Sequence, residues 1–115
     1  MKTISGDECY RTLDDTSYIL FYFTASWCGP CQKIYPEIIK LEEEIKEICK
    51  DLNDSIIFYK IDISDDDNQE LCEKCNVTSV PSFLLFKKRN CIDRVSGADI
   101  NQIKNMTEKI IKDIL

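Results

Sequence analysis

The sequence predicts an α/β fold in which helices flank both faces of a mixed central β-sheet. Two continuously apolar runs, residues 18–23 and 56–61, have the length and composition of strands buried on both faces. Segments with apolar residues at helical spacing separate and follow these runs, and two short apolar runs on either side of residue 90 predict an antiparallel hairpin. The expected order is β, α, β, α, β, α, β, β, α. The length of 115 residues predicts one domain over residues 1–115.

The first half of the chain is expected to hold two strands and two helices. Residues 1–4 are predicted to form a short edge strand, and Ser5 followed by Glu8 is a capping-box pattern that opens a helix through about residue 14. After the first buried strand, a long helix is expected over about residues 31–51. Its apolar positions recur at helical spacing: Ile34, Ile38, Leu41, Ile45 and Ile48. Pro36 is expected to bend this helix, because proline has no backbone N–H.

The second half is expected to complete the sheet and to add two helices. The hairpin is predicted to turn around Arg89 and Asn90, and the isoleucines of the last segment should pack one helix face on the sheet. The acidic run at residues 65–67 lacks the spacing and the glycine of a calcium loop, so we interpret it as a solvated loop. The expected elements are the strand at 56–61, a short helix at 68–75, strands at 83–88 and 91–95, and a helix at 99–115.

Composition excludes several classes of protein. A net charge of −6 with no basic patch argues against binding to nucleic acid. No apolar run approaches the roughly 20 residues that span a bilayer, and residues 1–7 are too polar for a signal peptide, so no membrane association is expected. Seven cysteines is an odd count without the spacing of a disulfide framework, which favours a reducing compartment. We therefore expect a cytoplasmic protein.

Residues 27–31, Trp-Cys-Gly-Pro-Cys, predict a redox-active dithiol. They lie between the first buried strand and the long helix, so Cys28 should occupy the helix N-terminus. Unpaired backbone N–H groups and the positive end of the helix dipole favour a thiolate there. Two intervening residues bring both sulfurs within disulfide reach, and Pro30 fits the first helical turn. The pattern predicts a Cys28–Cys31 redox disulfide.

With this motif the chain resembles the thioredoxin family, and the resemblance covers nearly the whole length of the chain. Residues 27–31 match the family's active-site signature, and Pro36 matches the proline that bends its long helix. Residues 80–82, Val-Pro-Ser, match the segment whose proline is cis and faces the disulfide. Residues 83–87 match the strand that follows, and residues 96–98 match the glycine turn before the last helix. The resemblance implies the thioredoxin fold.

The resemblance also implies an activity, protein-disulfide reduction by dithiol–disulfide exchange. Cys28 as a thiolate would attack a client disulfide, and Cys31 would then attack Cys28 and release the reduced client. No metal or organic cofactor would be bound. An NADPH-dependent flavoprotein thioredoxin reductase would restore the dithiol, so the expected partners are that reductase and client proteins with exposed disulfides. The protein would act as a monomer in electron transport and cell redox homeostasis.

Further residues are expected to shape the site around the dithiol. Trp27 is interpreted as a shield for the dithiol and a flat contact for clients, with a merely packed tryptophan as the alternative. Gly-Pro between the cysteines is typical of reducing members, and the chain has no histidine to stabilise the Cys28 thiolate, so a potential near about −270 mV is expected. The shaping residues are Trp27, Gly29, Pro30 and Pro81, and the candidate client contacts are Val80, Gly97 and Ala98.

One position departs from the family pattern. Most thioredoxins carry a buried aspartate six residues before the first active-site cysteine, where this chain has Tyr22. Tyrosine, with a reference pKa of about 10, cannot accept the proton of the resolving cysteine at pH 7. We therefore expect Cys31 to ionise more easily, resolution to be slower or to use water as base, and Tyr22→Asp to speed turnover. Lys60, which lies near that aspartate in the family, is expected to turn to solvent or to Asp62.

Other interpretations stay open at this stage. One is a thioredoxin-fold binding module with little turnover, which Tyr22 keeps possible. Another is an oxidase or isomerase, which the Gly-Pro pair opposes. Cys72 and Cys75 form a second C-x-x-C pair, but zinc takes about four ligands and there is no histidine, so no metal site is expected. These two cysteines are interpreted as semi-buried thiols, with a regulatory disulfide as the alternative. Three further cysteines carry no motif: Cys9, Cys49 and Cys91.

Overall fold

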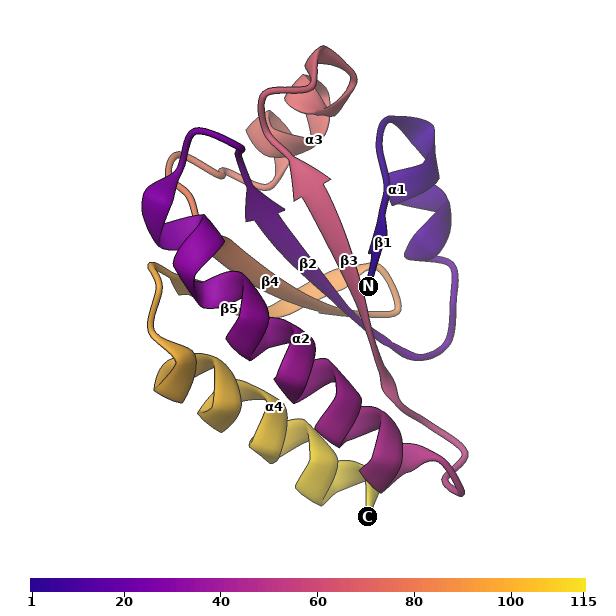
Figure 1. The fold of residues 1–115 in the computed structure, drawn as a ribbon. Coiled ribbons are helices and arrows are strands. Elements are labelled where there is room, and N and C mark those ends of the chain that lie inside the picture. Colours follow the sequence, from indigo (N-terminus) through magenta and orange to yellow (C-terminus); the bar gives the residue numbers. More distant parts are fainter.

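A computed structural model describes residues 1–115 and confirms the predicted order of strands and helices (Figure 1). No helix is both long enough and apolar enough to cross a membrane. The elements are β1 (Lys2–Thr3), α1 (Asp7–Thr12), β2 (Tyr18–Thr24), α2 (Gly29–Cys49), β3 (Ile56–Asp62), the 3₁₀ helix η1 (Asp66–Asn68), α3 (Gln69–Lys74), β4 (Ser82–Lys87), β5 (Asn90–Ser96) and α4 (Ile100–Ile114).

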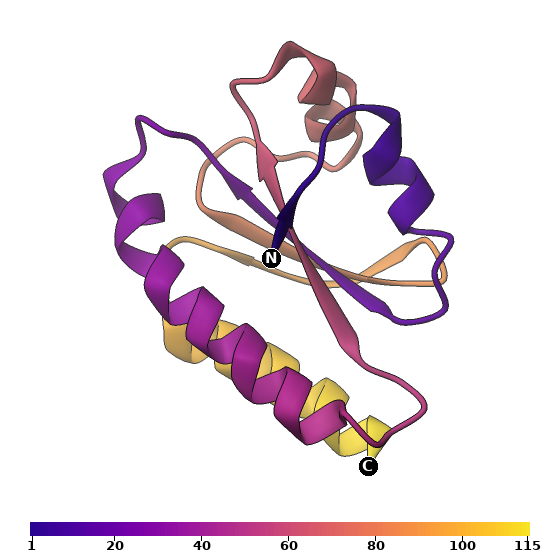
Figure 2. The same ribbon diagram turned by 45° about the vertical axis from the view of Figure 1, so that its right-hand side comes forward.

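The five strands form one mixed sheet in the order β1-β3-β2-β4-β5. Strand β3 is parallel to both β1 and β2, whereas β4 runs antiparallel to β2 and β5 antiparallel to β4. Helices α2 and α4 lie side by side on one face, and α1 and α3 lie on the other (Figures 1 and 2). The sheet is therefore a central layer between two helical layers, as predicted.

Alternation along the central strands supplies both hydrophobic cores. Because successive strand residues point to opposite faces, Leu20 and Tyr22 pack under α2 and α4, whereas Phe21 and Phe23 pack under α1 and α3. All four side chains are at most 1% exposed. A strand with both faces covered has no polar side to show, and this explains the continuous apolar run in the sequence.

The start of α1 differs from the prediction. Gly6, with a φ of 58°, is the N-cap, and no side chain caps the helix, so the predicted capping box of Ser5 and Glu8 is wrong. The Gly6 N–H instead donates to the Asn68 Oδ1 atom at 2.9 Å. A contact with a residue 62 positions away therefore sets where this helix begins, and the helix ends at Thr12 rather than near residue 14.

The long helix α2 begins two residues earlier than predicted and ends at Cys49. Its N-cap is Cys28, and Pro36 lies inside it without ending it. A buried stripe along the helix packs on the sheet, as the helical spacing predicted; it includes Ile34, Ile38, Leu41 and Ile45. The prediction is wrong at Ile48, which is 48% exposed, because the last buried position of the helix is Cys49. Because α2 packs on the sheet, its first turn lies at the carboxyl ends of β2 and β3.

The β4–β5 hairpin turns at Lys88 and Arg89, one residue earlier than predicted. Both residues have a positive φ, 49° and 69° respectively. The Arg89 guanidinium donates to the Asp14 carboxylate and to the Tyr10 carbonyl oxygen, which ties the turn to the end of α1. Contacts made across the fold therefore hold two ordinary residues in a conformation that usually selects glycine or asparagine.

We expect Lys88→Gly to raise the free energy of unfolding by up to about 1 kcal/mol, because glycine adopts a positive φ without the Cβ clash. Urea denaturation measures the change. The same substitution at Lys104, an exposed position in α4, is the matched control and should destabilise by about 1 kcal/mol. Destabilisation of both variants would contradict the assignment of the turn.

Helix α4 begins where the sequence predicted. Asp99 is its N-cap, and its Oδ1 atom accepts hydrogen bonds from the N–H groups of Asn101 at 3.0 Å and Gln102 at 3.3 Å. The buried face of the helix includes Ile103 and Met106.

Asp99→Ala should lower the free energy of unfolding by about 1 kcal/mol, because two helical N–H groups lose their acceptor. Asp113→Ala, near the other end of α4, is the control, since this exposed carboxylate caps nothing. Equal effects of the two substitutions in urea denaturation would argue against the cap.

Candidate active site

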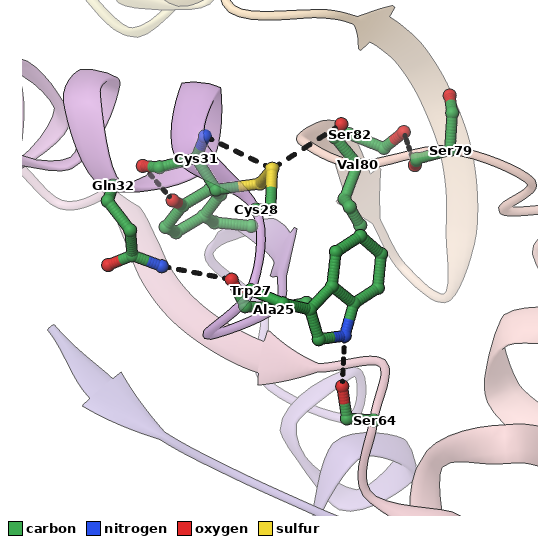
Figure 3. The surroundings of a disulfide bond; sticks show 10 residues. Ala25, Trp27, Cys28, Cys31, Gln32, Ser64, Ser79, Val80 and Ser82 are labelled. Carbon is green, nitrogen blue, oxygen red and sulfur yellow. Dashed lines mark hydrogen bonds between the residues drawn. A yellow bond between two sulfur atoms is a disulfide. The ribbon is translucent and has the colours of Figure 1, made fainter.

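The two cysteines of the motif lie at the start of α2, directly after β2. Cys28 has an extended backbone (φ −89°, ψ 107°), and its Sγ atom accepts a hydrogen bond from the Cys31 N–H at 3.2 Å (Figure 3). The two residues form a disulfide, with their Cα atoms 5.3 Å apart. Capping by Cys28 therefore brings the sulfur to the positive end of the helix, as the motif predicted.

The two sulfurs differ in their access to solvent. Cys31 is 0% exposed, whereas Cys28 is 6% exposed. Ala25 packs with both cysteines, and Ile63 and Val80 partly cover them. The Cys28 Sγ atom lies 3.8 Å from the Val80 carbonyl oxygen. A client that approaches this surface can therefore reach Cys28 and not Cys31.

The segment before β4 closes the site on the side of Val80. The Val80–Pro81 peptide bond is cis, as the resemblance implied. The Ser82 hydroxyl donates to the Ser79 carbonyl oxygen at 2.7 Å and holds the turn that presents Val80 to the disulfide (Figure 3).

Gly97 and Ala98 reach the site from the loop between β5 and α4. The Gly97 N–H donates to the Pro81 carbonyl oxygen at 2.9 Å, which places this loop next to Val80 and Pro81. Ala98 also lines an open pocket of about 560 Å³ together with Gly29 and Pro30. Three segments far apart in the sequence therefore meet near the start of α2.

Trp27 lies at the edge of the site. Its side chain is 69% exposed, so it does not serve as a core tryptophan. The indole N–H donates to the Ser64 Oγ atom at 3.0 Å, and the Ser64 N–H donates to the Asp62 Oδ1 atom at 2.8 Å. These bonds fix the ring in one orientation while they leave its surface open for contact. Ser64 was not predicted, because a single serine 37 residues away in the sequence carries no motif.

Tyr22 lies directly behind the dithiol. It is 1% exposed, and its hydroxyl donates to the Cys31 carbonyl oxygen at 2.8 Å. Its ring stacks on Phe83, with centroids 5.1 Å apart and planes at 6°, and on Tyr35 at 6.1 Å. Burial raises the pKa of Tyr22, so the hydroxyl stays protonated and donates at neutral pH. Tyr22 is therefore bonded to the backbone of the resolving cysteine, a contact that the sequence did not predict.

Lys60 lies opposite Tyr22 in the β2–β3 register. Its Nζ atom is 4.7 Å from the centroid of the Tyr35 ring, and it forms no ion pair with Asp62. The predicted alternative of a pairing with Asp62 is therefore wrong, whereas the Lys60 side chain is partly exposed to solvent. Its charge lies over an aromatic face instead, an arrangement worth about 0.5–2 kcal/mol.

The other five cysteines are free. No three cysteine, aspartate, glutamate or histidine side chains lie together in a way that could hold a metal ion. Cys72 lies within α3 and Cys75 caps it, three residues apart. Cβ atoms at this helical spacing are about 5–6 Å apart, whereas a disulfide needs about 3.5–4.5 Å. In this structure both are free, half-buried thiols.

Burial raises the pKa of the Cys9 thiol to about 11. The thiol of an unfolded chain ionises near about 8.5, so the folded protein keeps this proton in a pH range where the unfolded chain has lost it. The contribution to stability is complete below about pH 8.5 and is lost as the pH rises toward 11. Between pH 7.5 and pH 10, the urea midpoint of unfolding should fall further for the wild type than for Cys9→Ala. Equal falls would contradict this assignment.

Comparisons with known proteins point to one family. The family model for Thioredoxin matches residues 2–111. "Thioredoxin 1" of Plasmodium falciparum is 31% identical over 105 residues, which cover 91% of each chain. "Thioredoxin O1, mitochondrial" of Arabidopsis thaliana is 36% identical over 93 residues, which are 81% of this chain but only 44% of that protein. Chlamydomonas reinhardtii thioredoxin f2 shares the fold, with a TM-score of 0.82, 22% identity, and coverage of 95% and 94% of the two chains.

The family match agrees with the geometry of the site. The matched residues include the capped dithiol, the cis-proline segment and the glycine loop that meets it. The paired sulfurs provide for dithiol–disulfide exchange without a bound cofactor. The chain belongs to the thioredoxin family and is a thiol–disulfide oxidoreductase whose redox-active pair is Cys28–Cys31.

Proposed function

We propose that the protein reduces disulfides of client proteins, with Cys28 as the nucleophile and Cys31 as the resolving thiol. The observation that carries this assignment is the difference in exposure, 6% for Cys28 and 0% for Cys31. Only the sulfur that caps the helix is open to a client, and the helix N–H groups favour its thiolate. Clients would lie against Trp27 and the surface formed by Val80 and Gly97.

The electron donor we propose is an NADPH-dependent flavoprotein thioredoxin reductase. The Gly-Pro pair and the lack of any histidine support a reducing rather than an oxidising protein. Both half-reactions would use Cys28, one to reduce the client and one to be reduced. We further propose that the protein is a monomer, because one chain supplies every residue of the site, and that it works in the cytoplasm, since five of its cysteines are free thiols.

Turnover of insulin disulfides tests the function and the donor together. The wild type is assayed with NADPH and a thioredoxin reductase, and separately with dithiothreitol. Cys91→Ser, which removes an exposed thiol far along the sequence from the motif, should match the wild type in both assays. Turnover with dithiothreitol alone would reject the flavoprotein donor. No turnover with either donor would reject the reductase function and favour a binding module.

Size and location are tested separately. Light scattering at micromolar concentration should give the mass of one 13.4 kDa chain, and a dimer would reject the proposed monomer. Fractionation of cells that carry the full-length protein should place it with cytoplasmic markers. Recovery with mitochondrial markers, the compartment in the name of the Arabidopsis relative, would reject the cytoplasmic location.

A further inference from the structure

A pocket of about 200 Å³ with mostly polar lining residues lies where β2 and β3 end, next to the first turn of α2. Its wall includes Thr24 and Ala25 from the end of β2, Gln32 from α2, and Lys60 and Asp62 from β3. Ala25 belongs to the same packed cluster as the two active-site cysteines. The Gln32 side-chain amide donates to the Ala25 carbonyl oxygen at 2.9 Å and ties this wall to the first turn of α2 (Figure 3). Ala25 therefore connects the pocket to the packed cluster that holds the resolving cysteine.

The register of β2 and β3 gathers four polar side chains at this pocket. Tyr22 lies opposite Lys60, and Thr24 lies opposite Asp62. Residues two apart in a strand share a face, so all four occupy one face of the sheet. Tyr22 packs in the core under α2, which identifies that face as the one covered by α2. The polar groups therefore lie between the ends of the two strands and the helix that carries Cys31.

The Thr24 hydroxyl indicates that the pocket holds water. Thr24 is 2% exposed, and its hydroxyl makes no hydrogen bond of ordinary geometry, although it lies close enough to the Tyr22 hydroxyl to lower the pKa of that group. Leaving a buried hydroxyl unpaired is unfavourable, and proteins commonly satisfy such groups with buried water. A pocket of about 200 Å³ with several polar groups in its wall has room for such water.

Asp62 is the only carboxylate in the wall of this pocket. It forms no ion pair, because Lys60 lies over the Tyr35 ring instead. Its Oδ1 atom accepts one hydrogen bond, from the Ser64 N–H, so lone pairs remain free for water. The side chain is partly exposed, and a proton that it gains can leave to solvent.

We propose that Asp62, through water held beside Thr24, accepts the proton that Cys31 releases when Cys31 resolves the mixed disulfide. The inference rests on the exchange reaction proposed above and assigns its missing proton acceptor. Tyr22 cannot serve, because its protonated hydroxyl donates to the Cys31 carbonyl oxygen. Asp62 acts from the neighbouring strand, two residues beyond the position opposite Tyr22.

The step balances without an added oxidant or reductant. The Cys31 S–H bond breaks, and its proton passes through water to the Asp62 carboxylate. The Cys31 thiolate then forms a bond to the Cys28 sulfur, and the bond from Cys28 to the client sulfur breaks. The client sulfur leaves as a thiolate and takes a proton from solvent, and Asp62 returns its proton to solvent. The client is reduced by two electrons, and the dithiol is oxidised to the disulfide.

The charged and titratable groups that face this path come from three elements. They are Tyr22 on β2, Lys60 and Asp62 on β3, and Cys28, Cys31 and Tyr35 on α2. The Asp62 carboxylate gives the proton of Cys31 an acceptor that neither Tyr22 nor Lys60 provides. Loss of this acceptor should therefore shift the resolution step toward higher pH.

Stopped-flow reaction of the reduced protein with excess 5,5′-dithiobis(2-nitrobenzoate) separates the two steps. The first equivalent of coloured thiolate reports attack by Cys28, and its rate depends on reagent concentration. The second reports attack by Cys31, and its rate does not. Asp62→Asn removes the acceptor but keeps an oxygen for the Ser64 N–H. Asp66→Asn, at an exposed aspartate four residues further along the chain in η1, is the matched control.

We expect Asp62→Asn to slow the second step at least about tenfold at pH 7, since a positioned general base contributes about 10²–10⁴-fold. The first step should change less than about twofold, and the difference should vanish above about pH 9, where the thiol ionises by itself. Thr24→Val, which removes the hydroxyl and keeps the shape, should slow the same step. Asp66→Asn should match the wild type in both steps.

Equal second-step rates for Asp62→Asn and Asp66→Asn at every pH would overturn the inference. A slower first step in Asp62→Asn, with no change in the second, would also overturn it, because that result means a role in attack or in shape. Failure of the wild type to release a second equivalent is a different result, since it would reject the exchange reaction itself.

Discussion

Cys31→Ser is expected to abolish turnover of client disulfides and to leave the protein bonded to its clients. In this variant Cys28 keeps its place at the N-terminus of α2, so its thiolate still attacks a client disulfide. Serine cannot displace the client sulfur, so the mixed disulfide accumulates instead of being resolved. Insulin reduction should fall at least about 10³-fold, and mass spectrometry should find client attached through Cys28.

Cys28→Ser should be equally inactive but should capture no client, because the remaining Cys31 sulfur is 0% exposed. Cys91→Ser should turn over clients at the wild-type rate without capturing them, although Cys91 is the exposed one of the five free cysteines. Capture by Cys28→Ser would reverse the proposed roles of the two sulfurs.

Tyr22→Asp is expected to lower the free energy of unfolding by about 3–5 kcal/mol. The substitution removes a ring that is 1% exposed and stacked on Phe83, which leaves a cavity of the kind made by large-to-small core changes. It also buries a carboxylate behind the dithiol, where Lys60 is turned over the Tyr35 ring. Because whole domains are stable by only about 5–15 kcal/mol, this loss is large.

Tyr22→Phe distinguishes the contribution of the ring to stability from that of the hydroxyl. It keeps the stacking and loses only the hydrogen bond to the Cys31 carbonyl oxygen, so about 1 kcal/mol of destabilisation is expected. Tyr59→Phe, at a half-buried tyrosine whose hydroxyl makes no hydrogen bond within the protein, is the control and should change little. A Tyr22→Asp variant within about 1 kcal/mol of the wild type in urea denaturation would contradict this account of the core.

The expected loss of stability limits how the predicted faster turnover of Tyr22→Asp can be tested. A gain in rate can be measured only at temperatures where the variant stays folded. The inferred role of Asp62 gives a further test, because a new carboxylate at position 22 should reduce the effect of Asp62→Asn on the second step. Independent effects of the two substitutions would mean that they act on different protons.

Much of the fold followed from local patterns in the chain. Buried strands show as continuous apolar runs, and α2 and α4 show as stripes at helical spacing, since burial against two layers leaves few other compositions. The dithiol was predictable because its chemistry needs a fixed spacing, Cys28 to Cys31, at one kind of place, a helix N-terminus.

Tertiary structure decided what depends on residues far apart in the chain. The start of α1 depends on Asn68, and the hairpin turn depends on Arg89 reaching the end of α1. The partners of the site, such as Ser64 for the Trp27 indole, are single residues that carry no pattern of their own. Only the β2–β3 register places Asp62 opposite Thr24. A sequence shows which chemistry is present, whereas packing decides which groups meet, because distances across the fold arise only when the sheet and helices assemble.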